Sequence, residues 1–169
     1  MTDDGLEQAR DRLREKMGKG ARFDAPSAPH EALSAMRLAR AACTRRITSI
    51  DDRGLEQPLT AALVAEVSCL ARYLAEGLEQ LTGHIGLEGG DAERSSDLAG
   101  EVTLAKILPG RALRALYLHA LQHLDVALRD LDDAGWQKSL EVPGLAVGTP
   151  ASAVSLMNAA LQRCSKELH

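Results

Sequence analysis

The stretch from Ile107 to Trp136 constrains the fold of this 169-residue chain more than any other. Its apolar residues recur at steps of three and four, the spacing of one face of an α-helix. Pro109 stands near the start, where the N–H that proline lacks would have no partner inside a helix. Asp132 and Gly135 interrupt the pattern near its end. The stretch predicts a core helix whose buried face is Leu113, Leu116, Ala120, Leu124, Ala127, Leu128 and Leu131.

Three more stretches, at about 30–50, 59–82 and 150–169, carry the same helical spacing. The second stretch has the longest seam, meaning the row of apolar residues on one face of the predicted helix. The last stretch begins with Pro150 after Thr149, a residue type that caps helices. No repeat and no strand-like alternation is found. We therefore predict an all-α protein, a four-helix bundle with connections long enough for a topology other than up-and-down. The predicted seams are Met36, Cys43, Ile47 and Ile50; Leu59, Leu63, Val67, Leu70, Leu74, Leu78 and Leu81; and Val154, Met157, Leu161, Cys164 and Leu168.

Outside these helices, the chain divides into an N-terminal extension and two connectors. Residues 1–29 are predicted to form an amphipathic helix, at about 3–18, and a linker rich in glycine and proline, so that the bundle domain is 30–169. The glycine-rich stretch 83–100 is either a mobile loop over one end of the bundle or a short helix. The stretch 137–149 is a turn-rich connector.

Composition and charge exclude several classes of partner. Aromatic residues make up only 2% of the chain, and the net charge is −4, so neither base stacking nor phosphate binding is expected and we predict no nucleic-acid partner. No apolar run is expected to reach the length of a membrane span, and the polar, acidic N-terminus is unlike a secretory signal. Cys43, Cys69 and Cys164 each fall on a helical pattern. They are expected to be reduced, buried thiols in a cytoplasmic protein.

Glu66, His119 and His123 are the candidate catalytic residues. The two histidines are one helical turn apart and share a flank of their helix, which would suit a divalent metal. Glu66 lies at the edge of the seam of a neighbouring helix, from which it could supply a carboxylate. The alternative is a pair of histidines that is structural or contacts a substrate. The catalytic sequence motifs of zinc proteases, P-loop proteins and serine hydrolases are absent.

Arg40 lies near the middle of the first core seam. Charged side chains are rarely buried without a partner. One interpretation is an arginine that extends its charge to solvent at one end of the bundle. The other is a cation that faces a pocket and binds the carboxylate of a substrate.

The order of these segments resembles the N-terminal domain of the mycothiol-dependent maleylpyruvate isomerase family, one of the DinB-like four-helix bundles. The most specific similarity runs from Leu108-Pro-Gly-Arg-Ala-Leu-Arg114 through His119 and His123 to Trp136. Weaker similarities are found in 21–29, 45–58 and 148–152. The resemblance implies a DinB-like bundle with an N-terminal helical extension. The smaller C-terminal domain of many family members has no counterpart in the sequence.

The resemblance also implies a divalent metal and a thiol cofactor that attacks an unsaturated diacid. The family's metal ligands fall on Glu66, Leu161 and Ser165 of this chain, and two arginines of the family fall on Asn158 and Ala160. The resemblance therefore implies that the metal ligands have been replaced. Because each ligand both binds the metal and fixes its geometry, we predict neither metal nor cofactor.

Three hypotheses on function follow. The first is a metal-free protein of specialised metabolism that binds a small organic molecule and isomerises, cyclises or adds to it by acid–base catalysis, with Glu66 assisted by His119 or His123. The second is a non-catalytic binding or assembly protein, including a homodimer. The third is a thiol-dependent isomerase or transferase with a metal site rebuilt from Glu66, His119 and His123. The sequence alone does not identify a substrate.

Overall fold

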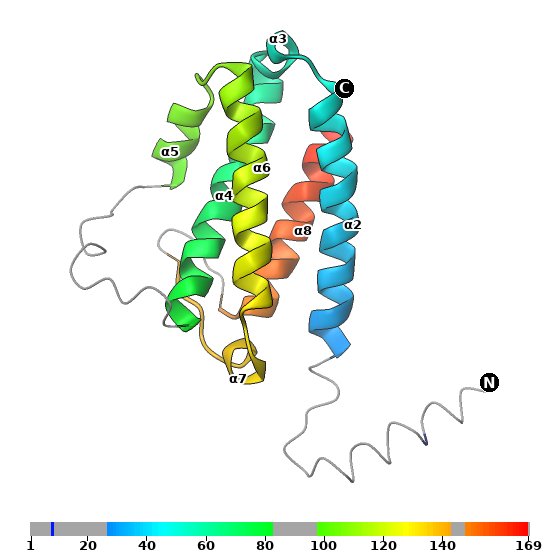
Figure 1. Ribbon diagram of the computed structural model, residues 1–169, viewed down its shortest axis with the longest axis vertical. Helices are drawn as coiled ribbons and strands as arrows, with labels where there is room; N and C mark the ends of the chain where they lie inside the picture. Colours follow the sequence, from blue (N-terminus) through cyan, green and yellow to red (C-terminus); the bar gives the residue numbers. More distant parts are fainter. Residues whose placement is uncertain (1–7, 9–26, 83–97, 143–147, 169) are drawn as a thin grey trace.

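The computed structural model describes residue 8 and residues 27–82, 98–142 and 148–168 (Figure 1). The helices of these described residues, with no β-strand among them, are α2 (Ser27–Ser49), α3 (Asp52–Leu55), α4 (Pro58–Thr82), α5 (Leu98–Ala105), α6 (Gly110–Arg129), α7 (Asp133–Trp136) and α8 (Pro150–Glu167). The four long helices are the four that the sequence predicts. The bounds of α2, α4 and α8 agree with the prediction to within a few residues, whereas α6 ends at Arg129, well before the predicted end at Trp136.

The bundle is built from two pairs of parallel helices. α4 packs along α6, and α2 packs along α8, with α4 also touching α8. α4 and α6 run in the same direction, and α2 and α8 run opposite to them (Figure 1). Arg46, near the end of α2, donates from Nη1 to the carbonyl oxygen of Leu168 at 2.8 Å, which places the ends of α2 and α8 together. The topology is therefore not up-and-down, which the predicted lengths of the connections allow.

Aliphatic side chains fill the core, as the low aromatic content requires. The predicted seams of α2, α6 and α8 are buried or partly buried, and so is most of the seam of α4. Leu59 is the exception, since it is 83% exposed. Leu59 lies in the first turn of α4, beyond the part of the helix that packs against the rest of the bundle. Its helical spacing was predicted correctly, but this spacing did not ensure burial.

The long stretch 107–136 forms two helices rather than one. α6 ends at Arg129, and the separate turn α7 begins after Asp132, whose carboxylate accepts from the backbone N–H of Gly135 at 2.6 Å. At the other end, a Cβ on Gly110 would lie 2.1 Å from the backbone oxygen of Asp52. Glycine at this position lets α3 pack directly on the first turn of α6.

α5 is the helix that the sequence did not define. It runs along α4 after the stretch 83–97, so it forms part of the connection between the parallel helices α4 and α6 (Figure 1). Residues 83–97 lie outside the described part of the chain, and so does the proposal that the stretch 83–100 covers one end of the bundle. The predicted N-terminal helix and linker also lie outside it, apart from Gln8 and the first residues of α2.

The expectation that no apolar run approaches a membrane span is wrong for α4. This helix has 25 residues and a window of mean hydropathy 1.3, which is sufficient by length and composition. However, 61% of that window is buried inside the bundle. Its apolar character is therefore explained by its place in the core, where it contacts α5, α6 and α8.

Candidate functional site

A pocket of about 260 Å³ opens between α4, α5 and α8. Its size is near the lower limit of ligand pockets, which range from roughly 300 to 1,000 Å³. The wall is mainly aliphatic. α4, α5 and α8 each contribute one side. The lining residues are Leu63, Glu66, Val67, Leu70, Leu98, Val102, Leu156, Ala160, Arg163 and Cys164.

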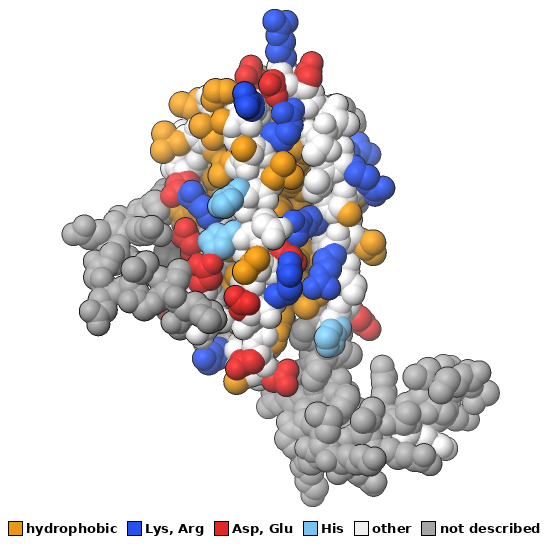
Figure 2. Space-filling view, in the orientation of Figure 1, with side chains coloured by type: hydrophobic (Ala, Val, Ile, Leu, Met, Phe, Trp, Pro, Cys, Tyr) orange, Lys and Arg blue, Asp and Glu red, His pale blue; other side chains and the backbone are white. Residues whose placement is uncertain are grey.

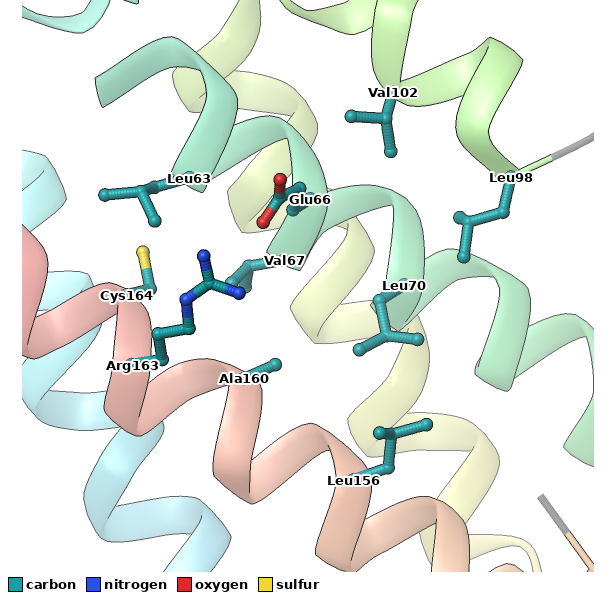
Figure 3. Close-up of a pocket in the computed structure, with 10 residues that line it drawn as sticks. All are labelled: Leu63, Glu66, Val67, Leu70, Leu98, Val102, Leu156, Ala160, Arg163 and Cys164. Atoms are coloured by element: carbon teal, nitrogen blue, oxygen red, sulfur yellow. The ribbon is translucent and has the colours of Figure 1, made fainter. Parts of the chain in front are cut away.

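The pocket has a polar end and an apolar end (Figure 3). Glu66 of α4 and Arg163 of α8 extend toward each other across the polar end. Leu70, Leu98 and Leu156 close the apolar end. A site of this form suits a molecule with an aliphatic body and one polar end group.

Glu66 is exposed at the pocket wall and forms no hydrogen bond or ion pair with any described residue. Arg163 is engaged along its own helix, where its Nε lies 3.4 Å from Oε1 of Glu167. The carboxylate of Glu66 thus remains available to accept hydrogen bonds from a bound molecule.

Cys164 connects the pocket to a polar cluster in the core. Its thiol is in hydrogen-bonding contact with the thiol of Cys43 on α2, and Cys43 also interacts with the hydroxyl of Tyr117 on α6. Tyr117 in turn shares a hydrogen bond of 2.8 Å with Oγ1 of Thr44. All three cysteines are buried and free, as the sequence predicted for a set of core thiols.

The pKa values of Cys43 and Cys164 are shifted in opposite directions. The pKa of Cys43 is lowered, first by the hydrogen bond from Cys164 and then by Tyr117 and by the positive charge of Arg46. The pKa of Cys164 is raised, first by its hydrogen bond to Cys43, then by burial and by the negative charge of Glu66.

Arg40 lies away from the pocket, in contact with α6. Its Nη1 is 3.8 Å from Oδ1 of Asp125, and Oδ2 of the same carboxylate accepts from Nη2 of Arg129 at 2.5 Å. The arginine is thus positioned by a carboxylate of the protein itself. It does not line the pocket, so the role in carboxylate binding predicted for Arg40 has no support from its position.

Both histidines belong to α6. His119 is exposed. His123 is half-buried, and its Nε2 forms a short hydrogen bond with Oε1 of Glu79 on α4. His123 therefore pairs with Glu79, a residue that was not predicted to contact it.

Glu66 lies far from this histidine pair. Thirteen residues separate it from Glu79 on α4, which corresponds to about 20 Å along the helix axis and about 140° around it. Glu79 faces α6, whereas Glu66 faces the pocket beside α8. The structure therefore does not bring Glu66 together with His119 and His123.

Among the residues that line the pocket, Glu66 and Cys164 are those with groups that could ligate a divalent metal. Structural and catalytic metal sites take three or more protein ligands, and the described residues contain no group of three His, Cys, Asp or Glu side chains that could hold one. Of the positions matched by resemblance, Glu66 lines the pocket, Leu161 is buried in the core and Ser165 is half-buried. A leucine in that set removes a ligand outright.

Glu66 was predicted from the sequence, but most of the residues that line the pocket around it were not. The walls supplied by α5 and the cation Arg163 were not anticipated, because neither stands out in a helical pattern. Cys164 was assigned to the seam of α8, which is correct, but its access to the pocket depends on how α8 packs against α4. The signal that could have identified Arg163 is its place directly before Cys164, a residue of the predicted buried face of α8.

Comparison with known proteins gives a fold. No protein-family model matches the sequence, and no curated protein matches it. Among solved structures, the mycothiol-dependent maleylpyruvate isomerase is similar, with a TM-score of 0.68 and 18% identity over 83% of this chain. A variant of that isomerase with one histidine replaced by alanine gives a TM-score of 0.67 at 20% identity. The chain spans 60% of the length of these isomerase chains. The predicted DinB-like, maleylpyruvate isomerase-like fold is confirmed.

Proposed function

We propose that this protein binds a small organic molecule in the pocket between α4, α5 and α8, without a metal ion. The observation that carries the proposal is the position of Glu66, a carboxylate with no hydrogen-bond or ion-pair partner among the described residues, on the wall of a mainly aliphatic pocket. Ligand pockets combine apolar walls with a few polar groups that fix orientation, and this pocket has that composition. The proposed ligand has an aliphatic body and a polar end group that meets Glu66 and Arg163.

The proposed chemistry is acid–base catalysis by Glu66. A carboxylate within hydrogen-bonding reach of a ligand can remove a proton from one atom and return it to another. Isomerisation, cyclisation and addition to an activated double bond all need this transfer. His119 and His123 are not included in the proposed site, because they lie on the side of α4 that faces away from the pocket.

A binding screen tests the proposal. We would measure the thermal stability of the protein with a library of small molecules that combine an aliphatic body with an amine, hydroxyl or carboxylate end group. Compounds that raise the Tm would then be titrated by calorimetry. Glu66→Gln should weaken the binding of hydrogen-bond donors by about 10-fold or more, because hydrogen bonds to a charged group contribute about 1.5–3 kcal/mol.

Two control variants separate the pocket from the rest of the surface. Glu31→Gln removes an exposed carboxylate of α2, and His119→Ala removes an exposed side chain of α6. Both should bind as the unchanged protein does. Equal affinity of the Glu66→Gln variant for every compound found would contradict the role of Glu66.

Self-association is a second candidate function. Leu59, Leu104 and Ile107 are 83%, 66% and 79% exposed, and they belong to the start of α4, the end of α5 and the turn after it. Figure 2 shows apolar side chains gathered on this part of the surface. We propose that this surface pairs with a second copy of the chain. Light scattering would show a dimer that Leu104→Glu converts to a monomer, and a monomeric unchanged protein would contradict the proposal.

A further inference from the structure

The polar end of the pocket carries two charges of opposite sign on opposite walls. Glu66 belongs to α4 and Arg163 to α8, and their side chains extend toward each other (Figure 3). No ion pair joins these two among the described residues, and Arg163 instead donates from its Nε to Oε1 of Glu167 at 3.4 Å. Because a guanidinium also carries donors on its terminal nitrogens, Arg163 can still bind a ligand carboxylate.

A ligand with a single charge would suit only one of these two groups. An amine pairs with Glu66 but offers nothing to Arg163. A carboxylate pairs with Arg163 but brings a second negative charge toward Glu66, and like charges at short distance repel each other. A head group that carries both an ammonium and a carboxylate pairs with both side chains at once. α-Amino acids hold these two groups on a single carbon atom.

The apolar end of the pocket fits the side chain of an aliphatic amino acid. Glu66 and Leu70 are four residues apart on α4, which corresponds to about 6 Å along the helix axis. The distance from the ammonium group of such an amino acid to the end of its side chain is similar. Leu98 and Leu156 close this end of the pocket with Leu70. The volume of about 260 Å³ suits a molecule of this size better than a large cofactor.

The exposure of the two charged residues favours the same class of ligand. Glu66 is exposed, and the side chain of Arg163 is 64% exposed. A zwitterionic head group held between them keeps part of its hydration, so the high cost of burying charge is avoided. Only the aliphatic side chain of the ligand then leaves water, and it does so against aliphatic walls.

We propose that the ligand of this pocket is an aliphatic α-amino acid in its zwitterionic form. The ammonium group donates to the carboxylate of Glu66, and the carboxylate accepts from the guanidinium of Arg163. The aliphatic side chain lies among Leu70, Leu98 and Leu156. This inference rests on the proposed function, because it names the class of molecule that the same pocket binds.

The test is calorimetric titration of the folded, full-length protein with leucine and with two analogues that each lack one charge. Isoamylamine lacks the carboxylate of leucine, and isocaproate lacks its ammonium group. Leucine should bind about 5-fold or more tightly than either analogue, which is the upper range for an ion pair at an exposed site. The reason is that leucine alone pairs with both Glu66 and Arg163.

Two variants assign the charges to their partners. Arg163→Gln should bring the affinities of leucine and isoamylamine together, since the ligand carboxylate then has no cation to meet. Glu66→Gln should bring the affinities of leucine and isocaproate together for the corresponding reason. Lys166→Gln is the matched control, because it removes an exposed cation of α8 that does not line the pocket. Its affinity for leucine should equal that of the unchanged protein.

The place of binding is tested with Ala160→Phe, which puts a ring into the pocket and should abolish the binding of leucine. Circular dichroism confirms that each variant is folded. Leucine binding that persists in the folded Ala160→Phe variant, or that is no tighter than the binding of an analogue, would overturn the inference.

The failure of this inference is distinguishable from the failure of the proposed function. If other aliphatic compounds bind in the pocket but leucine does not, the inference is wrong and the proposed function stands. If neither leucine nor any compound of the binding screen binds in the pocket, both are wrong.

Discussion

Tyr117 places a polar group in the core. It is fully buried, yet its hydroxyl bonds Thr44 at 2.8 Å and contacts the thiol of Cys43. Buried hydroxyls are costly unless they are paired, and this one joins α6 to two residues of α2. The packing of these two helices therefore depends on a polar contact as well as on aliphatic burial.

We expect Tyr117→Phe to lower the free energy of unfolding by about 1 kcal/mol, the net contribution of a hydrogen bond between neutral groups. Urea denaturation would measure it. Thr44→Val removes the partner, and the double variant completes a cycle that isolates the coupling between the two side chains. Exact additivity of the two single changes would show that the hydrogen bond contributes nothing.

At the residue scale, the sequence predicted which residues carry polar chemistry better than it predicted their partners. Glu66 was found because a carboxylate at the edge of an aliphatic seam is unusual. Arg40 was interpreted either as a cation directed to solvent or as one that faces a pocket. It pairs with Asp125, and the two helices that bring these residues together are not identifiable from spacing alone. The same limit explains why Glu79 was not recognised as the partner of His123.

At the scale of single elements, α8 shows how local sequence sets a helix boundary. Thr149 has an extended backbone, and its Oγ1 accepts from the backbone N–H of Ser152 at 3.1 Å, while Pro150 occupies the first helical position. Both features were predicted from the residues Thr149 and Pro150, because capping depends only on neighbours in sequence.

Thr149→Ala should therefore destabilise the protein by about 1 kcal/mol, the usual cost of losing an N-cap. Thr149→Ser keeps a capping hydroxyl and should retain most of the stability. The stabilities of the two variants are compared by their midpoints of urea denaturation, provided that the dependence of the unfolding free energy on urea concentration is the same for both. A Thr149→Ser variant as unstable as Thr149→Ala would show that the methyl group, and not the cap, is responsible.

Gly110 gives the second prediction for an element. A Cβ at this position would meet the carbonyl oxygen of Asp52 at 2.1 Å and could be accommodated only if backbone moved. We expect Gly110→Ala to cost about 2–3 kcal/mol, as overpacking does. At Gly77 the nearest atom is a side-chain methyl of Val142 at 2.9 Å, so Gly77→Ala should cost less in the same assay.

α5 marks the limit of prediction at this scale. Its eight residues, Leu98–Ala105, have too few turns for an apolar period to be recognised, and the preceding glycines obscured its start. What keeps it helical is its packing on α4, where Val102 and Ala105 are buried. An element stabilised by tertiary contacts leaves a weak signal in the sequence.

At the scale of the whole molecule, the buried thiols and Tyr117 predict how stability depends on pH. Burial raises the pKa of Cys69 and of Tyr117, and the hydrogen bond with Cys43 raises that of Cys164. In the unfolded chain these groups ionise from about pH 9 for the thiols and about pH 10 for the tyrosine. The folded state keeps them protonated, so their contribution is present below pH 9 and is lost as the pH rises further.

Urea denaturation between pH 8 and pH 11 should therefore show stability falling above about pH 9. The pKa of Cys43 is lowered, so it offsets part of this loss. Tyr117→Phe should reduce the slope above pH 10, because it removes one of the groups that ionise only on unfolding. A profile that stays flat to pH 11 would contradict the protonation states assigned to the core.

The arrangement of whole helices decides where the site is formed. Because α4 runs parallel to α6 and also touches α8, its two sides face different partners. One side meets the histidines of α6, and the other forms the pocket with α5 and α8. The sequence predicted both sets of residues, but only this topology shows that they belong to two separate places.

The measurement that tests the central claim most directly is methyl NMR of the protein during titration with small molecules from the binding screen. Binding in the pocket should give saturable shifts at the methyl groups of Leu70, Val102 and Leu156. The exposed methyl groups of Leu38, Leu118 and Val126, which do not line the pocket, should stay unchanged. Shifts confined to those outer methyl groups, or no saturable shift with any compound, would contradict a ligand site between α4, α5 and α8.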